Sequence, residues 1–277
     1  MKKYYIRRMQ ISALLILTFS STNVNGIDYE KIFTSGRVGM TQSSDLPNTG
    51  ELHFVVGHRF GEIKGGLYDM FGLDLATIRL GFDYGISDVF AVGIGRSTWE
   101  KSYDIFSKIA LMRQSDDGSP VALTGYVMAS VNTLRDFYPE ENEGLWNRSS
   151  LSGQLMVSRK QGVFSFQVTS LFFRNNFETR LEDDLNLFAI PISVSIKIAK
   201  RIAFTSQYIP VFDEPVFAGD NPLSFGFDID TGGHQFQLNF SNSPALIEKA
   251  LLTDSYGSWL KGRIYFGFNL VRVFYLH

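Results

Sequence analysis

Cysteine is absent from this chain of 277 residues. The protein therefore has no disulfide framework, no thiolate metal site and no thiol chemistry. A surplus of basic charge is absent too, because 26 Lys and Arg residues stand against 28 Asp and Glu residues. Such a composition gives no indication of nucleic-acid binding. Burial and hydrogen bonding must therefore stabilise the fold.

Long apolar runs are also scarce, and the clearest one lies near the N-terminus at residues 11–19. Four basic residues precede it: Lys2, Lys3, Arg7 and Arg8. This layout predicts a secretory signal at residues 1–26, and its apolar part is too short for a membrane-spanning helix. Removing the four basic residues leaves 22 basic and 28 acidic residues, a net charge of −6. The rest of the chain predicts no transmembrane helix, so only a closed β-barrel could cross a membrane.

Apolar residues instead recur at every second position. The stretch "FAIPISVSIKIAKRIAFTSQY" at 188–208 begins with such an alternation: Phe188, Ile190, Ile192, Val194, Ile196 and Ile198. This spacing is typical of strands with one apolar and one polar face. The same pattern between Glu51 and Leu270 predicts twelve strands.

The predicted connections alternate in length, which favours a membrane barrel over a soluble sandwich. The long links cover 61–75, 134–148, 174–185, 210–222 and 243–258, while a short link near 99–101 breaks the rule. Membrane barrels have short periplasmic turns and long external loops. We therefore predict an all-β, transmembrane, antiparallel up-and-down barrel of about twelve strands with short helices in its external loops.

The polar faces of these strands are expected to line the lumen. A basic residue facing lipid at mid-bilayer costs about 2–4 kcal/mol, and the centres of the apolar faces carry no charge. The predicted lumen-lining residues are Glu51, His53, Arg79, Asp83, Asp104, Lys108, Asp228 and Arg263. Aromatic residues near the strand ends would suit the lipid headgroup layers: Tyr84, Phe90, Trp99, Tyr103, Tyr208 and Tyr275.

Two stretches also carry a family resemblance. "ELHFVVGHRFG" at 51–61 and "GLYDMFGLDLATIRLGFDYGISDVFAVGIGRS" at 66–97 resemble the start of an uncharacterised family of outer-membrane β-barrels from Bacteroides-type bacteria. The resemblance implies a membrane barrel but no activity and no functional residues. We expect a signal at 1–26, an N-terminal extension at 27–48 and the barrel at 49–277. The extension either stays in the periplasm or tucks into the barrel.

Catalytic and metal-binding patterns are weak. Glu51 and His53 share one face, but two ligands without a third predict an ion-paired lining and no metal site. No His stands beside a Ser as in barrel lipases, so we expect no enzyme and no cofactor. "GIGRS" at 93–97 lacks the third glycine of a nucleotide loop, and its small residues would make room for a neighbouring Arg or Tyr.

The long links carry three further features. "GGLYDMFGLD" holds an apolar external-loop patch, which either packs over the barrel mouth or docks a partner: Leu67, Tyr68, Met70 and Phe71. "SPALIEKALL" predicts a short helix capped by Ser243 and packed against the rim. The links 134–148, 174–185 and 210–222 hold eleven acidic and four basic residues. These acids are simply solvated, attract cations, or bridge to anionic lipid through divalent ions.

The sequence therefore leaves two functions open for a protein of the outer membrane. The first is a small passive pore or solute-uptake channel, with small solutes or cations as its cargo. The alternative is a closed barrel that serves as a structural or docking platform, whose partner would be another envelope protein or a surface glycan. In both cases the expected surroundings are outer-membrane lipid.

Overall fold

The computed structural model describes residues 30–116, 118–134, 144–176, 186–212 and 219–276. Strands dominate these residues, and a single α-helix, α1 (Glu248–Thr253), joins them. None of the described helices is both long and apolar enough to cross a membrane. The predicted signal and parts of three long links lie outside the described residues.

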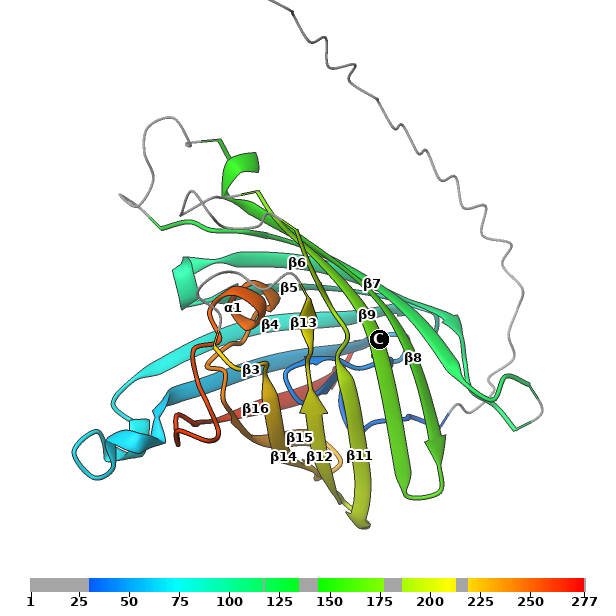
Figure 1. Cartoon of the computed structure of the whole chain (residues 1–277). Coiled ribbons are helices and arrows are strands. Elements are labelled where there is room, and N and C mark those ends of the chain that lie inside the picture. The colour runs from blue at the N-terminus through cyan, green and yellow to red at the C-terminus, as the bar shows by residue number, and fades with distance from the viewer. Residues whose placement is uncertain (1–29, 117, 135–143, 177–185, 213–218, 277) are drawn as a thin grey trace, which may run out of the picture.

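The strands form one closed antiparallel barrel (Figure 1). Its segments are β3 (Glu51–Glu62), β4 (Ala76–Ser87), β5 (Phe90–Ser97), β6 (Tyr103–Met112), β7 (Ala122–Val131), β8 (Ser149–Gln161), β9 (Phe164–Asn175), β10 (Asn186–Ala189), β11 (Ile192–Ala199), β12 (Ile202–Tyr208), β13 (Val211–Phe212), β14 (Leu223–Asp230), β15 (His234–Ser241) and β16 (Tyr265–Tyr275). Pairing of β16 with β3 closes the sheet.

These fourteen segments make twelve barrel strands. β10 and β11 both pair with β9 and form one interrupted strand, and β12 continues as β13 in the same way. Pro191 explains the first interruption, because proline has no N–H to donate to the ladder. Its carbonyl still accepts a hydrogen bond from the Thr169 N–H at 2.9 Å. The predicted twelve-strand antiparallel barrel is confirmed.

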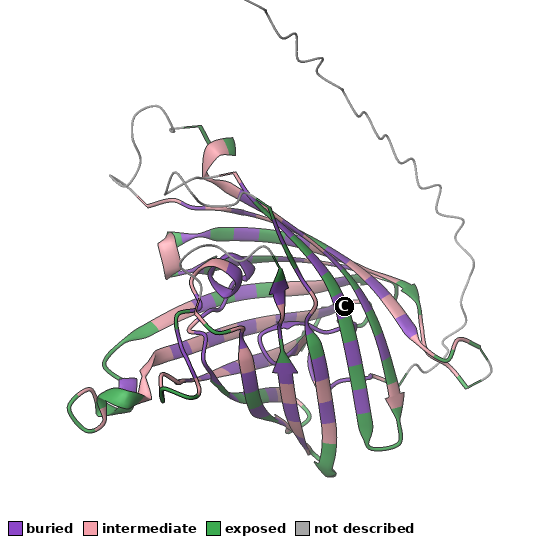
Figure 2. Ribbon diagram, in the orientation of Figure 1, coloured by how far each residue is buried: buried purple, intermediate pink, exposed green. Residues whose placement is uncertain are grey.

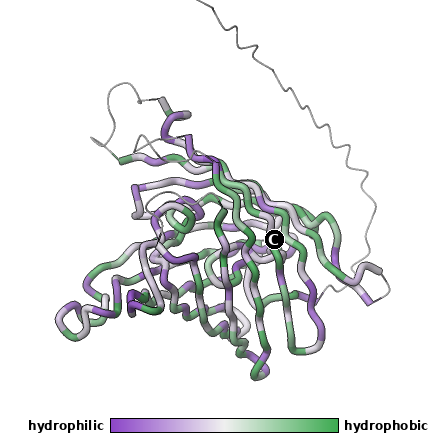
Figure 3. Tube along the Cα trace, viewed as in Figure 1, coloured by the Kyte–Doolittle hydropathy of each residue, from purple (hydrophilic) through white to green (hydrophobic). Residues whose placement is uncertain are grey.

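The apolar faces point away from the lumen. Along β9, Phe164, Phe166 and Val168 are exposed, whereas Ser165 and Gln167 are buried. Burial and hydropathy alternate in the same way along the other strands (Figures 2 and 3). An outward apolar belt around a polar interior is what a surrounding lipid bilayer favours.

The connections sort by length between the two ends of the barrel. Tight turns join β4 to β5, β8 to β9, β11 to β12 and β14 to β15, and a nine-residue link joins β6 to β7. The long links lie at the opposite end, where the β5–β6 link at 98–102 is the short exception that the sequence predicts. We call these the tight-turn end and the long-loop end; by the general rule for such barrels they face the periplasm and the exterior.

Residues 30–50 lie inside the barrel, which they enter from the tight-turn end, and we call them the N-terminal plug (Figure 1, blue). Within the plug, β1 (Arg37–Val38) and β2 (Thr41–Gln42) form a small hairpin. Its turn uses Gly39, whose φ of +58° favours glycine. Of the two arrangements that the sequence leaves open for this extension, the structure has the one inside the lumen.

The last long link also folds inward, and its residues 243–257 are called the inward loop. Its helix α1 begins at Glu248, so the prediction of a helix capped by Ser243 is wrong. Ile247 occupies the N-cap in an extended conformation, and the Ser243 hydroxyl instead accepts a hydrogen bond from the Ala245 N–H at 3.3 Å. The helix is buried within the lumen and does not merely pack against the rim.

Candidate functional site

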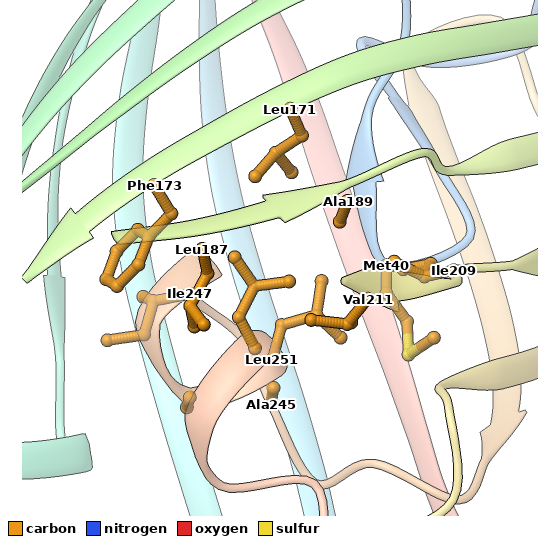
Figure 4. Close-up of a cluster of buried hydrophobic side chains, with 12 residues drawn as sticks. Met40, Leu171, Phe173, Leu187, Ala189, Ile209, Val211, Ala245, Ile247 and Leu251 are labelled. Carbon is orange, nitrogen blue, oxygen red and sulfur yellow. The ribbon is translucent and has the colours of Figure 1, made fainter. Parts of the chain in front are cut away.

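An apolar core fills the part of the lumen nearest the long-loop end (Figure 4). It joins three parts of the chain: Met40 from the plug; Leu171, Phe173, Leu187, Ala189, Ile209 and Val211 from the barrel wall; and Ala245, Ile247, Ala250, Leu251 and Leu252 from the inward loop. Every member is buried. The plug and the inward loop therefore meet inside the barrel, on a wall that is locally apolar.

Polar contacts hold α1 in this position. Glu248 Oε1 accepts hydrogen bonds from the Tyr126 hydroxyl at 3.4 Å and from Gln154 Nε2 at 3.3 Å. On the other side, Lys249 Nζ lies 2.7 Å from a carboxylate oxygen of Glu100. Glu100 adopts a φ of +51°, a strained value for a residue with a side chain. The link between β5 and β6 is thus shaped to present this carboxylate to the inward loop.

Trp99 belongs to the same short link and packs against the apolar core inside the barrel. The prediction that Trp99 takes part in an outer aromatic girdle is therefore wrong. The link that carries Trp99 turns into the lumen. A position near a strand end therefore does not by itself show whether an aromatic ring faces lipid or covers an internal helix.

Lys108 anchors the plug. Its ammonium group donates to three plug carbonyls, those of Gly36 at 3.2 Å, Ser43 at 3.0 Å and Asp45 at 3.1 Å. The Asp45 carboxylate accepts from the N–H groups of Ile32 at 3.1 Å and Phe33 at 2.6 Å, which fastens the start of the plug to its end. Burial raises the pKa of Asp45, and these two backbone bonds oppose the rise.

Two glutamines of the barrel wall bind the plug hairpin. Gln207 Oε1 accepts from the Met40 N–H at 2.8 Å, while its Nε2 donates to Thr41 Oγ1 at 2.7 Å. Gln167 Oε1 accepts from the Ser44 N–H at 2.9 Å, and its Nε2 donates to the backbone carbonyl of Gln42 at 2.8 Å. The wall thus satisfies plug backbone groups that would otherwise be buried without partners.

Glu51 and His53 lie together on the inner face at the tight-turn end. A Glu51 oxygen is 3.1 Å from His53 Nε2, and the other accepts from Asn48 Nδ2 at 2.8 Å. Lys31 Nζ lies 3.9 Å from the same carboxylate. Glu51 therefore connects the first barrel strand to both ends of the plug.

Arg79 and Asp104 form a bidentate, buried ion pair across β5. Gly81 and Gly95 make this possible, since a Cβ on either would collide with the Arg79 guanidinium. This is the role that the sequence suggests for the small residues of "GIGRS". Asp83 lies half-buried on the same inner face as Arg79.

The remaining predicted lining residues lie in two different places. Asp228 is buried, and its Oδ1 accepts from Gln237 Nε2 at 3.1 Å. Arg263 precedes β16 at the long-loop end, where its Nε donates to Glu62 at 2.9 Å. This bond raises the pKa of Arg263, whose side chain is 39% exposed. Arg263 thus stands at the rim, whereas Asp228 stands deep in the lumen.

The external-loop patch remains exposed. Its link forms two 3₁₀ turns, Ile63–Gly65 and Met70–Gly72, and leaves Leu67 79% and Tyr68 92% accessible. Phe71 adopts a φ of +56° and is half-exposed. Most of the acidic residues predicted in the other long links fall within 135–143, 177–185 and 213–218, outside the described residues.

Chemistry-bearing side chains are sparse in the part of the chain that the structure describes. No three His, Asp or Glu residues come together there in a way that could hold a metal ion. His58, which faces outward on β3, has Ile78 and Phe268 as its cross-strand neighbours and stacks on the Phe268 ring at 5.2 Å. These neighbours give His58 no serine to activate.

The inner apolar core and the plug contacts are not predicted from the sequence. One signal for the core is available, because Leu171, Phe172 and Phe173 are consecutive and place apolar side chains on both faces of β9. A strand that is apolar on both faces is covered on both faces. The plug contacts of Lys108, Gln167 and Gln207 join residues that are 63 to 167 positions apart, and no local pattern reveals them.

Comparisons with known proteins agree with the barrel. The model of a family described as "Membrane bound beta barrel domain" (DUF5777) matches residues 33–274. No curated protein matches the chain. The solved NanC porin structure has a TM-score of 0.51 at 10% identity, covering 82% of this chain and all of that one. At this identity the likeness shows the fold alone.

Two further solved barrels are less similar. A Salmonella typhi OmpF complex with daunomycin has a TM-score of 0.41 at 8% identity, covering 81% of this chain and 97% of that one. The outer membrane phospholipase A from Escherichia coli has a TM-score of 0.44 at 7% identity, covering 82% and 93%.

Proposed function

From the premise that this chain belongs to the family of membrane bound beta barrel domains (DUF5777), we propose that it is an outer-membrane barrel with a closed lumen that serves as a structural or docking platform. The observation that carries this proposal is the meeting of the N-terminal plug and the inward loop in one apolar core. Met40 of the plug lies in that core, and its sulfur is 2.9 Å from Ser241 Oγ of the wall.

The energy of the core supports a lumen that stays closed. Withdrawal of the inward loop would return six large apolar side chains to water: Leu171, Phe173, Leu187, Ile209, Leu251 and Leu252. At about 1.5–3 kcal/mol for each side chain, the cost is roughly 9–18 kcal/mol. Spontaneous opening would then be too rare to sustain a passive flux. An open pore would also need a polar wall where this one is apolar.

Conductance in planar lipid bilayers tests the closed lumen. The refolded mature protein is expected to give no discrete channels in any salt, and heat-dependent migration in gels checks that the barrel has folded. Discrete channels from the unaltered protein would count against the proposal. Leu251→Asp combined with Lys108→Met disturbs both the core and the plug and is expected to cause conductance, whereas Leu260→Asp with Lys108→Met, altered at a side chain 98% exposed, should stay silent.

A gated uptake channel is the second candidate. It is favoured by the way the plug is held, because Lys108, Gln167 and Gln207 bind it through hydrogen bonds that a ligand could replace. In that case Lys108→Met alone produces conductance. In a closed platform the inward loop still blocks the lumen, and Lys108→Met remains silent.

The platform role assigns a purpose to the external-loop patch, which would dock another envelope protein. Photo-crosslinking in cells from a position beside Tyr68 should capture a discrete partner. Tyr68→Ser with Phe71→Ser should abolish the product, while Leu260→Ser, a comparably exposed apolar residue of another long link, should not. An unchanged product in the double variant would rule out docking through this patch.

We also infer that the protein is not an enzyme and that lipid covers its outer faces. The apolar neighbours of His58 support the absence of outward Ser–His chemistry of the kind that barrel lipases use. Hydrolysis of phospholipid by the purified protein, above that of a His58→Phe variant, would overturn this inference. We also expect the family to come from Bacteroides-type bacteria.

A further inference from the structure

A cavity of about 360 Å³ opens into the lumen at the tight-turn end, the end assigned to the periplasm. The first residues of the plug form one side of it, and the β8–β9, β11–β12 and β14–β15 hairpins form most of the rest, together with ends of β3 and β16. It lies far from the inner apolar core and shares no lining residue with it. Nothing in the proposed function uses this space.

Basic side chains outnumber the two carboxylates, Glu51 and Asp230, in the cavity lining: Lys31, Lys160, Lys197, Lys200 and Arg201. Two of them have acidic neighbours, because Lys31 lies 3.9 Å from Glu51 and Lys160 lies 2.5 Å from Glu30. The other three come from β11 and its turn. The carboxylate that lines the cavity near them is Asp230, whose Oδ1 accepts from the Gly232 N–H at 2.7 Å.

A buried amide faces the same cavity. Gln235, at the start of β15, is only 8% exposed and lines the cavity, yet its Oε1 has no hydrogen-bond partner among the described residues. A buried amide without a partner is destabilising, so such a group usually serves a ligand or water. Rotation of the amide by half a turn presents its N–H₂ group to the cavity. Ser195, also buried, lines the wall and adds a hydroxyl.

We infer that this cavity binds a phosphate group. Several cations around one space favour a dianion, and a phosphate monoester also offers three strong acceptor oxygens to the amide and the hydroxyl. Lys200 and Arg201 supply the charge, while Gln235 and Ser195 supply directed donors. Because this end faces the periplasm, the group belongs either to a soluble phosphate ester or to an anionic phospholipid headgroup of the inner leaflet.

Binding of glycerol 3-phosphate to the folded protein in non-ionic detergent tests the first source by calorimetry. Native mass spectrometry tests the lipid headgroup as the source. It compares how many phosphatidylglycerol and how many phosphatidylcholine molecules the protein retains when it is released from nanodiscs that contain both lipids. Lys200→Gln with Arg201→Gln should weaken binding about tenfold and flatten its salt dependence. Gln235→Leu should weaken binding about fivefold with the salt dependence unchanged. The matched control is Arg159→Gln, an exposed cation on the neighbouring hairpin that does not line the cavity.

Each result decides the matter. The site with a soluble ligand is supported if the unaltered protein binds glycerol 3-phosphate, if Lys200→Gln with Arg201→Gln and Gln235→Leu each weaken this binding, and if Arg159→Gln does not. Selective retention of phosphatidylglycerol with the same dependence supports it with a lipid headgroup. Failure of the unaltered protein to bind either probe overturns the inference, and so does binding that Arg159→Gln weakens as strongly as Lys200→Gln with Arg201→Gln. A barrel that conducts ions leaves this test intact, because the cavity is distinct from the core that closes the lumen.

Discussion

Replacement of Lys108 by Met should loosen the N-terminal plug while the barrel stays folded. The ammonium group of Lys108 donates to the carbonyls of Gly36, Ser43 and Asp45, and methionine fills similar space without a donor. A buried acceptor left without a partner costs about 1–3 kcal/mol. We take the lower end for each carbonyl, about 3 kcal/mol in all, since water can enter from the tight-turn end. That energy corresponds to a roughly 150-fold shift toward the released plug.

Hydrogen exchange followed by mass spectrometry measures this shift directly. The N–H groups of Met40 and Ser44, which donate to wall glutamines, should exchange about two orders of magnitude faster in Lys108→Met. Strand amides such as those of β9 should keep their protection. Lys261→Met removes an exposed lysine from a long link and serves as the control. Unchanged protection of the plug in a folded Lys108→Met barrel would refute the reasoning.

Three further predictions concern the ion pair and the inward loop. Asp104→Asn leaves the Arg79 guanidinium buried without its counter-charge and should lower the free energy of unfolding by about 3–5 kcal/mol. The urea midpoint of unfolding in detergent measures this loss, and an unchanged midpoint would contradict the prediction. Gly95→Val should destabilise the barrel by displacing Arg79, whereas Gly153→Val, at a glycine with open space around it, should be tolerated. Equal thermal midpoints for the two variants would show that Arg79 does not need the space that the missing side chain of Gly95 leaves. Burial raises the pKa of Asp254 above the ordinary value for an aspartate. The folded state therefore binds the proton more tightly, so stability falls as the pH rises through the raised pKa. The urea midpoint of Asp254→Asn should therefore increase relative to that of the unaltered protein as the pH is raised from acidic values; parallel curves would argue against this.

Strand number and strand facing could be predicted because lipid imposes them locally. Apolar side chains are favoured where the outward face of β9 meets lipid, so the alternation of Phe164, Phe166 and Val168 is visible in a short window. The parity of link lengths adds a second local signal. Neither signal depends on residues far away in the chain.

The contents of the lumen could not be predicted in the same way. The plug is polar and turn-rich, and its backbone groups find partners such as Lys108 and Gln207 only after the barrel has closed. The inner apolar wall contradicts the simple expectation of a polar interior, because Leu171 and Phe173 cover a helix and face no water. Helix α1 begins at Glu248 because Ile247 before it is extended and takes part in the apolar core.

Labelling of a single introduced cysteine tests most directly whether the plug occupies the lumen. The chain has no cysteine of its own, so Met40→Cys carries the sole reactive thiol. Met40 is 7% exposed in the core, and a water-soluble maleimide should leave this thiol unmodified until the barrel is unfolded. Leu260→Cys, on an exposed link, should react at once. Equal rates of modification for the two thiols in the folded protein would contradict the account.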